Sequence, residues 1–195
     1  LGMALALTLL PLAASAADMA AEVVYVKGDA RIERGTELIK AEPRSQLMKG
    51  DTVTAGSKSM IKLLFRDDSV LTLAANSAMA IDEYVYNAGQ KRSTSVFKLL
   101  FGRLRAVVGR SALTLKTTTA VAGVRGTVFT IWYDEATKTT GVSVIEGVVQ
   151  LSNINPAIGG VQNVRAGQTS VVPVNAPPTA PQTRMPGPSL EPGED

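Results

Sequence analysis

The sequence predicts an all-β fold built from short strands, and three observations support this class. Apolar residues recur at every second position in several short segments, which is the periodicity of a strand with one buried face. Turn-forming residues interrupt the chain roughly every 8–15 residues. Hydrophobic residues make up 45% of the chain and aromatic residues only 5%. These features are typical of sandwiches, barrels and solenoids alike, so they leave the architecture open.

The alternation locates each expected strand. In residues 60–65, Ile61, Leu63 and Phe65 share one face. Residues 95–108 are the only segment with a competing helical pattern, and glycines with β-branched neighbours favour strand there. Either Phe129 and Ile131 or their alternating neighbours Val128 and Trp132 are expected in the core. The expected strands, in chain order, are residues 22–27, 60–65, 70–73, 103–108, 113–116, 127–133, 142–144 and 149–151.

The two ends of the chain differ from its middle. Residues 1–16 form an uncharged apolar run that ends in Ala14-Ser15-Ala16, a cleavage pattern of secretory signal peptides. We expect a cleaved leader, truncated at its start, and a periplasmic or secreted protein without a membrane span; half of a transmembrane helix is the alternative. Residues 173–195 hold seven of the ten prolines and predict a disordered tail. Between them we expect leading strands over 17–44 and one β domain over 45–172.

The residue inventory argues against catalysis. The chain has no cysteine and no histidine, so it lacks the commonest nucleophile–base pairs and the commonest metal ligands. The adjacent acidic pairs 67–68 and 134–135 fall in expected turns, where aspartate bonds its own backbone. We therefore expect no enzyme, no cofactor and no metal site.

Positive charge is concentrated in one segment. Residues 84–133 contain no acidic residue. They contain eight basic residues, namely Lys91, Arg92, Lys98, Arg103, Arg105, Arg110, Lys116 and Arg125. On strands of one sheet these would form a basic face, with Arg103 and Arg105 on the same side of one strand. The face is either a solvated surface or a site for an anionic partner. Export and sparse aromatics disfavour nucleic acid.

The segment 119–129 is the most informative in the chain. Gly123 and Gly126 flank Val124-Arg125 and lead into an apolar strand. One interpretation is a structural corner in which Arg125 bonds turn carbonyls, and this is favoured. The other is a rigid turn that presents Arg125 for recognition. The candidate partner-binding residues are Arg103, Arg105, Arg110 and Arg125, and the structural motif residues are Gly123, Gly126, Thr127 and Gly147.

Four motifs in order resemble the FecR domain family: residues 47–56 (LMKGDTVTAG), 63–73 (LLFRDDSVLTL), 117–129 (TTTAVAGVRGTVF) and 142–149 (VSVIEGVV). The resemblance covers roughly residues 45–172. The sequence departs from the pattern at Asp68, where the family usually has glycine, and at Thr118, where it often has proline.

The resemblance implies a β-solenoid-like stack, with a β-sandwich or jelly roll as the alternative. It also suggests two functions. The chain is either an exported, non-catalytic binding module for a protein or an anionic envelope polymer, or the periplasmic part of a FecR-type transmembrane regulator. Such regulators control an extracytoplasmic-function sigma factor in iron-siderophore signalling. The sequence upstream of Leu1 and a neighbouring sigma-factor gene would discriminate between them.

Overall fold

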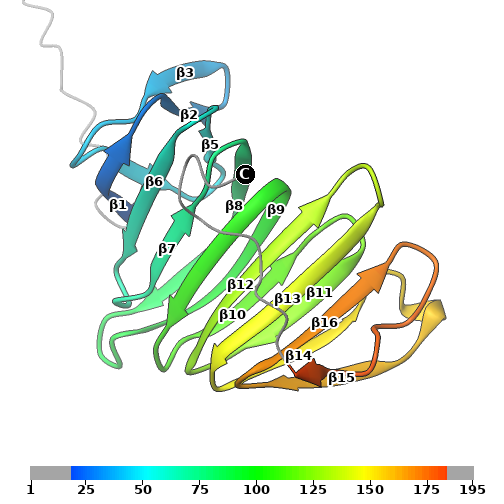
Figure 1. Ribbon diagram of the computed structural model, residues 1–195. Coiled ribbons are helices and arrows are strands. Elements are labelled where there is room, and N and C mark those ends of the chain that lie inside the picture. The colour runs from blue at the N-terminus through cyan, green and yellow to red at the C-terminus, as the bar shows by residue number, and fades with distance from the viewer. Residues whose placement is uncertain (1–18, 184–195) are drawn as a thin grey trace, which may run out of the picture.

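The computed structural model describes residues 19–183, which form seventeen strands and one short 3-10 helix (Figure 1). The first nine strands are β1 Met19–Lys27, β2 Ala30–Arg34, β3 Glu37–Lys40, β4 Gln46–Met48, β5 Thr52–Ala55, β6 Met60–Phe65, β7 Val70–Leu73, β8 Ser77–Asn87 and β9 Arg92–Val108. The remaining elements are β10 Ala112–Lys116, β11 Ala120–Val124, β12 Thr127–Asp134, β13 Thr139–Glu146, β14 Val148–Asn153, η1 Pro156–Ile158, β15 Val161–Arg165, β16 Gln168–Pro173 and β17 Gln182–Thr183.

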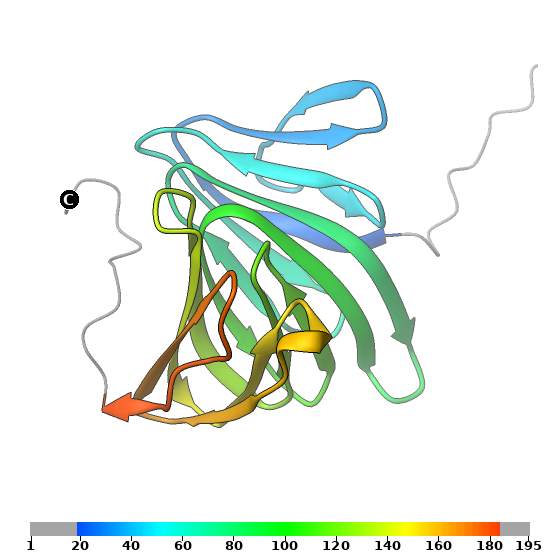
Figure 2. The same cartoon turned by 90° about the vertical axis from the view of Figure 1, so that its right-hand side faces the viewer.

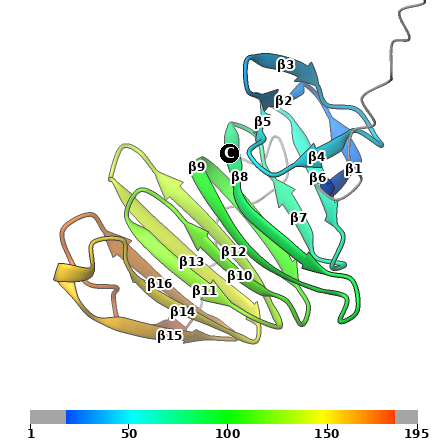
Figure 3. The same cartoon turned by 180° about the vertical axis from the view of Figure 1, so that it is seen from behind.

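The strands form two layers that are joined by one shared strand. Layer 1 has the order β4–β1–β6–β7–β9–β12–β13–β16–β17. Layer 2 has the order β3–β2–β5–β8–β9–β10–β11–β14–β15. The pairs within these layers are antiparallel except for β9 with β10, which is parallel. The chain therefore builds both layers together from one end of the stack to the other, as the colour gradient in Figures 1 and 3 shows.

The hydrophobic core lies between the layers and consists mainly of aliphatic side chains. In β12, Phe129 and Ile131 are fully buried and Val128 and Trp132 are only partly buried, which decides between the two alternatives that the alternation left open. Phe65 packs against Phe97 from the opposite layer, with ring centroids 4.9 Å apart. Figure 2 looks at the end of the stack formed by β14, β15 and β16. The predicted all-β, solenoid-like stack is confirmed, and the segment 95–108 with its competing helical pattern is part of the continuous strand β9.

Strand β9 crosses from layer 2 to layer 1 at Gly102. Before this residue, alternate side chains from Ser93 to Leu99 face the core; after it, the buried positions begin again at Leu104, out of phase. Gly102 has φ +83°, and a Cβ there would lie 2.6 Å from the Cα of Ser77 and against the Ser77 hydroxyl. The Arg103 N–H donates to Ser77 Oγ at 2.8 Å, which fixes the corner. Glycine is required because the left-handed backbone and the close approach both exclude a side chain.

The same corner occurs three times. At each corner, two neighbouring segments of the chain pass side by side from one layer to the other. One segment carries a glycine with positive φ. The other carries a serine or threonine whose hydroxyl donates to a carbonyl two residues earlier. The pairs are Gly28 with Ser59, Gly102 with Ser77, and Gly147 with Thr127. This pattern is an internal structural repeat, carried by residue types too common to reveal it in the sequence.

The start of the predicted disordered tail needs correction. The side-chain amide of Asn153 donates to the carbonyls of Pro173 and Ala176 at 3.0 and 2.9 Å. Ser170 Oγ donates to the carbonyl of Thr179 at 2.7 Å, and β17 pairs with β16. Residues 173–183 therefore pack on the domain, because a buried asparagine supplies the hydrogen bonds that their composition does not suggest.

The predicted leader (1–16) and residues 184–195 of the predicted tail lie outside the described residues. Between residues 19 and 183, no helix is long and apolar enough to cross a membrane.

Candidate binding surface

The predicted basic residues divide between the layers instead of forming one face. Arg103 and Arg105 lie on the outer face of layer 1, where they are opposite Trp132 and Thr130 of β12. Lys98 and Lys116 are opposite each other on the outer face of layer 2. The prediction of a single basic face is wrong because β9 passes through the corner at Gly102 and contributes to two layers.

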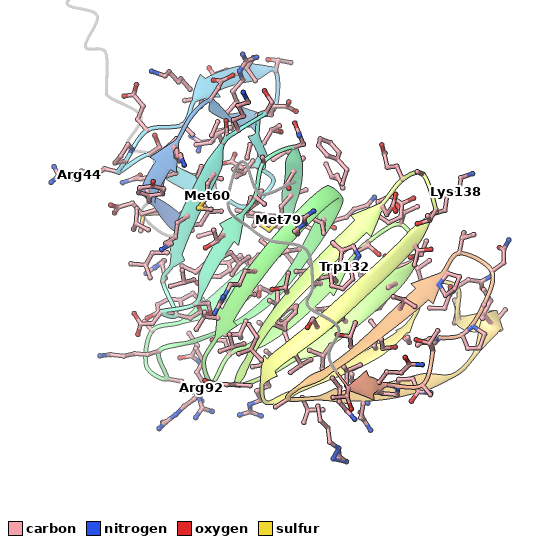
Figure 4. All side chains as sticks on the ribbon, in the orientation of Figure 1. Arg44, Met60, Met79, Arg92, Trp132 and Lys138 are labelled. Carbon is pink, nitrogen blue, oxygen red and sulfur yellow. The ribbon has the colours of Figure 1, made fainter. Side chains whose placement is uncertain are left out.

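Arg103 and Arg105 do share a face, as expected, and Trp132 lies beside them (Figure 4). The indole of Trp132 packs flat over Gly141 of β13, since a Cβ at that glycine would lie 2.7 Å from Trp132 Cη2. This part of layer 1 therefore presents an aromatic ring and two guanidinium groups on its outer face.

Arg110 and Arg125 meet at a different place, in an open groove of about 350 Å³ on the outer side of layer 2. Arg92, at the start of β9, is the third arginine of this groove. We call it the arginine groove. Its other side chains are aliphatic or neutral and polar, chiefly Val85, Asn87, Gln90, Thr94 and Ala112. Arg92 lies at the edge of the molecule opposite Lys138 (Figure 4).

The strand register explains why these residues converge. Asn87 of β8 is opposite Arg92 of β9. In the next row, Val85 is opposite Thr94, and Thr94 is opposite Ala112 of β10. Since Leu113 pairs with Val124, continuing that antiparallel register by one residue places Arg125 beside Ala112. The groove therefore spans four consecutive strands, β8 to β11.

The arginine groove is electropositive. No acidic residue lines it. Within residues 19–183, Arg92, Arg110 and Arg125 form no salt bridge, and the three pairs found there are Arg31–Asp29, Arg34–Asp51 and Lys40–Glu42, all in the N-terminal strands. Glu83 lies two residues before Val85 on β8 and is not among the residues that line the groove. Unpaired guanidinium groups that share a concave site raise the local concentration of anions.

The turn that carries Arg125 is rigid. Gly126 has φ +61°, and its N–H donates to the carbonyl of Gly109 at 2.7 Å. Thr127 Oγ1 donates to the carbonyls of Arg125 and Val148 at 3.1 and 3.0 Å. Gly147 packs against this turn, since its Cβ would lie 2.5 Å from the carbonyl oxygen of Gly126. The backbone of Arg125 is thus fixed by its neighbours, while its side chain is exposed.

Two of the predicted structural roles therefore change. The favoured role of Arg125 as a corner that bonds turn carbonyls is wrong, because Gly126, Thr127 and Gly147 hold this corner. Gly123 lies in β11 with open space where its Cβ would be, the nearest atom being the carbonyl oxygen of Gln150 at 3.9 Å. Its backbone does not require glycine. Gly123 and Arg125 lie on the same side of the chain. Because Gly123 has no side chain, the outer face of layer 2 has open space beside Arg125.

The acidic turn at Asp67 is part of the core. Asp67 is buried and accepts hydrogen bonds from Ser69 N–H at 3.2 Å and Ser93 Oγ at 2.5 Å. Burial, followed by the charge of Asp67, raises the pKa of the nearby Tyr84 hydroxyl. Asp134 caps its own turn by accepting hydrogen bonds from the backbone N–H groups of Ala136 and Thr137. The hydrogen bond from the Thr137 side chain, followed by these backbone bonds, lowers the pKa of Asp134. Both pairs thus act as turn formers, as expected from the sequence.

No three histidine, cysteine or acidic side chains gather to hold a metal ion within the part of the chain that the structure describes.

Sequence reasoning identifies only Arg110 and Arg125 of the groove. Arg92 belongs to the basic segment but not to the candidate partner-binding residues, and the neutral lining residues, such as Val85, are not candidates. Their convergence with Arg125 depends on pairings between β8, β9, β10 and β11, which no local pattern encodes. The available signal was weak: Val85 and Arg92 flank a short polar hairpin loop.

Comparison with known proteins defines the class to which this all-β stack belongs. The family of the FecR protein matches residues 51–150, just over half of the chain. The chain therefore belongs to the FecR family, as the four motifs suggested.

Two solved structures resemble the fold. They are crystal structures, at 1.65 and 2.50 Å resolution, of a "putative anti-sigma factor" from Parabacteroides distasonis ATCC 8503. The TM-scores are 0.56 and 0.55, and the sequence identity is 16% in both cases. Each comparison covers 68% of this chain and 59% of the Parabacteroides chain, so this chain spans less than two thirds of that protein's length. No curated protein matches the chain.

Proposed function

We propose that this chain is a non-catalytic, exported binding module that recognises a protein or an anionic envelope polymer. The observation that carries the proposal is the arginine groove, in which Arg92, Arg110 and Arg125 share one concave surface without an acidic partner. Guanidinium groups bind carboxylates and phosphates through paired hydrogen bonds, so this arrangement fits an anionic partner. A rigid turn holds Arg125, which lowers the cost of ordering on binding.

A direct test measures binding of the purified chain to polygalacturonate, to polyphosphate and to an acidic peptide, at low and at physiological salt. We expect binding that weakens with added salt and that is lost when all three arginines become glutamine. Lys138→Gln, a charge change at the opposite edge, is the matched control and should bind as wild type. Failure of all three anions to bind at low salt would overturn the proposal.

Export has its own test. The Ala14-Ser15-Ala16 pattern supports a mature protein that starts near Ala17. N-terminal sequencing of the protein recovered from the native envelope should find that start. A retained, membrane-anchored leader would contradict export of a cleaved module.

The second candidate function is the periplasmic part of a FecR-type regulator of an extracytoplasmic-function sigma factor. Family membership and the shared fold of the Parabacteroides structures favour it. A reporter driven by a cognate sigma factor should then change its output when the chain is deleted. Unchanged output, together with a cleaved leader, would leave the binding module as the function.

A further inference from the structure

The arginine groove has an apolar component that an anionic polymer would not use. Val85 is 67% exposed, so a polar residue at this position of β8 would not disturb the core. Thr94 and Ala112 follow it in the same row. Further along the row, Val148 is 43% exposed and is opposite Arg165 of β15. Aliphatic and basic side chains therefore lie together in one row across the outer face of layer 2.

This combination is characteristic of protein interfaces. Buried aliphatic contacts supply affinity at the centre of an interface, and arginine is enriched there while lysine is depleted. The three charges of the groove are all arginine, and Lys98 and Lys116 lie two rows away on the same face. A polysaccharide or polyphosphate could pair with the guanidinium groups but would leave Val85 and Ala112 in contact with water.

We propose that the arginine groove binds an acidic segment of a partner protein in which an apolar side chain stands between carboxylates. The apolar side chain packs on Val85 and Ala112, and the flanking carboxylates pair with Arg92, Arg110 and Arg125. This inference rests on the proposed binding function and selects a protein partner over a polymer. Charge complementarity supports it, since no acidic side chain lines the groove.

The dimensions fit an extended segment. Neighbouring strands lie about 4.8 Å apart, so three spacings from Val85 to Arg125 span about 14 Å. In an extended peptide, side chains two residues apart on one face are separated by about 7 Å. An apolar residue with acidic residues two positions away on either side therefore places carboxylates about 7 Å from its own contact with the aliphatic row. Arg125 lies at the end of that row, and Arg92 and Arg110 lie in the neighbouring row, where their long side chains can meet these carboxylates.

The experiment uses two fluorescein-labelled peptides that differ at one position, Glu-Glu-Leu-Glu-Glu and Glu-Glu-Gly-Glu-Glu. Binding to the full chain is measured by fluorescence anisotropy. We expect the leucine peptide to bind at least fivefold more tightly, because it buries apolar surface that the glycine peptide lacks. Val85→Ser should abolish this preference while leaving the weaker, charge-driven binding intact. The triple change of Arg92, Arg110 and Arg125 to glutamine should remove binding of both peptides.

The controls separate this inference from the proposed function. Val85 and the three arginines are on the surface, and circular dichroism and thermal unfolding should show that each variant keeps the wild-type fold. Lys138→Gln should leave both affinities unchanged. Equal affinity for the two peptides, or a leucine preference that survives Val85→Ser, would overturn the inference. If polygalacturonate or polyphosphate still bound through the arginines in that case, the binding function would stand with a polymer as its ligand.

Discussion

Asp68 shows how a single residue can keep a backbone conformation that glycine usually provides. It has φ +64° in the turn between β6 and β7, at the position where the resemblance to FecR domains places glycine. Asp tolerates the left-handed region better than most residues, but glycine adopts it without strain. At this departure from the family pattern, Asp68 therefore adopts a left-handed conformation that glycine would also allow.

Replacing Asp68 with glycine should stabilise the domain by about 0.5–1 kcal/mol, because relief of backbone strain exceeds the added entropy of the unfolded chain. Urea denaturation measures the change. Asp68→Ala is the control, since alanine keeps the strain and should give no gain. A loss of stability in the glycine variant would show that the Asp68 side chain makes a stabilising contact.

Gly102 and Gly123 can be compared directly, because a side chain is excluded at Gly102 but would fit at Gly123. Gly102→Ala places a Cβ against Ser77 at φ +83°, so we expect a loss of about 2–4 kcal/mol. Gly123→Ala meets open space in a strand and should be neutral or slightly stabilising. Similar losses at the two positions in a denaturant titration would contradict the assignment of Gly102 as the corner.

At the scale of elements, strand β12 connects the core to the binding surface. Its inward residues Phe129 and Ile131 are fully buried, while Trp132 faces outward beside Arg103. Such alternation is readable from sequence, because the two faces of a strand differ in every second residue. The position of Gly102 as a layer crossing was not readable in this way, since a local bulge in β9 shifts the phase of the alternation.

Phe129→Ala should lower the free energy of unfolding by about 3–5 kcal/mol, because it opens a cavity between the layers. Val128→Ala, on the outward side of the same strand, should cost about 1 kcal/mol or less because that side chain is only partly buried. Guanidinium chloride unfolding followed by Trp132 fluorescence compares the two. Equal losses of stability in the two variants would contradict the assignment of Phe129 to the core-facing side of β12 and of Val128 to its outer side.

At the scale of the whole molecule, two basic areas lie on different layers. The arginine groove is on layer 2, whereas Arg103 and Arg105 are on the outer face of layer 1. The sequence identified Arg103, Arg105, Arg110 and Arg125 as candidate partner-binding residues, with a structural role favoured for Arg125, but their grouping depends on pairings between distant strands. The family, the all-β class and the alternation along β12 were predictable from local patterns, whereas the side of β12 that faces the core was not. The groove was not, because Val85 and Arg125 lie forty residues apart in the chain.

The double change of Arg103 and Arg105 to glutamate tests whether layer 1 contributes to binding. If the groove is the binding site, this change should weaken acidic-peptide binding by less than about threefold, through long-range electrostatics that physiological salt screens. Anisotropy titrations at two salt concentrations give the comparison. A loss as large as that of the groove variants, persisting at high salt, would move the site to the face of layer 1.

The strand that belongs to both layers also determines how the molecule bears mechanical load. Arg92 begins β9 beneath the groove, and the same strand ends between β7 and β12 in the other layer. A force applied to the groove therefore acts on a strand whose backbone continues through the Gly102 corner into the other layer. Because β9 pairs with strands of both layers, pulling the layers apart would also break the hydrogen bonds of β9 on one side of that corner.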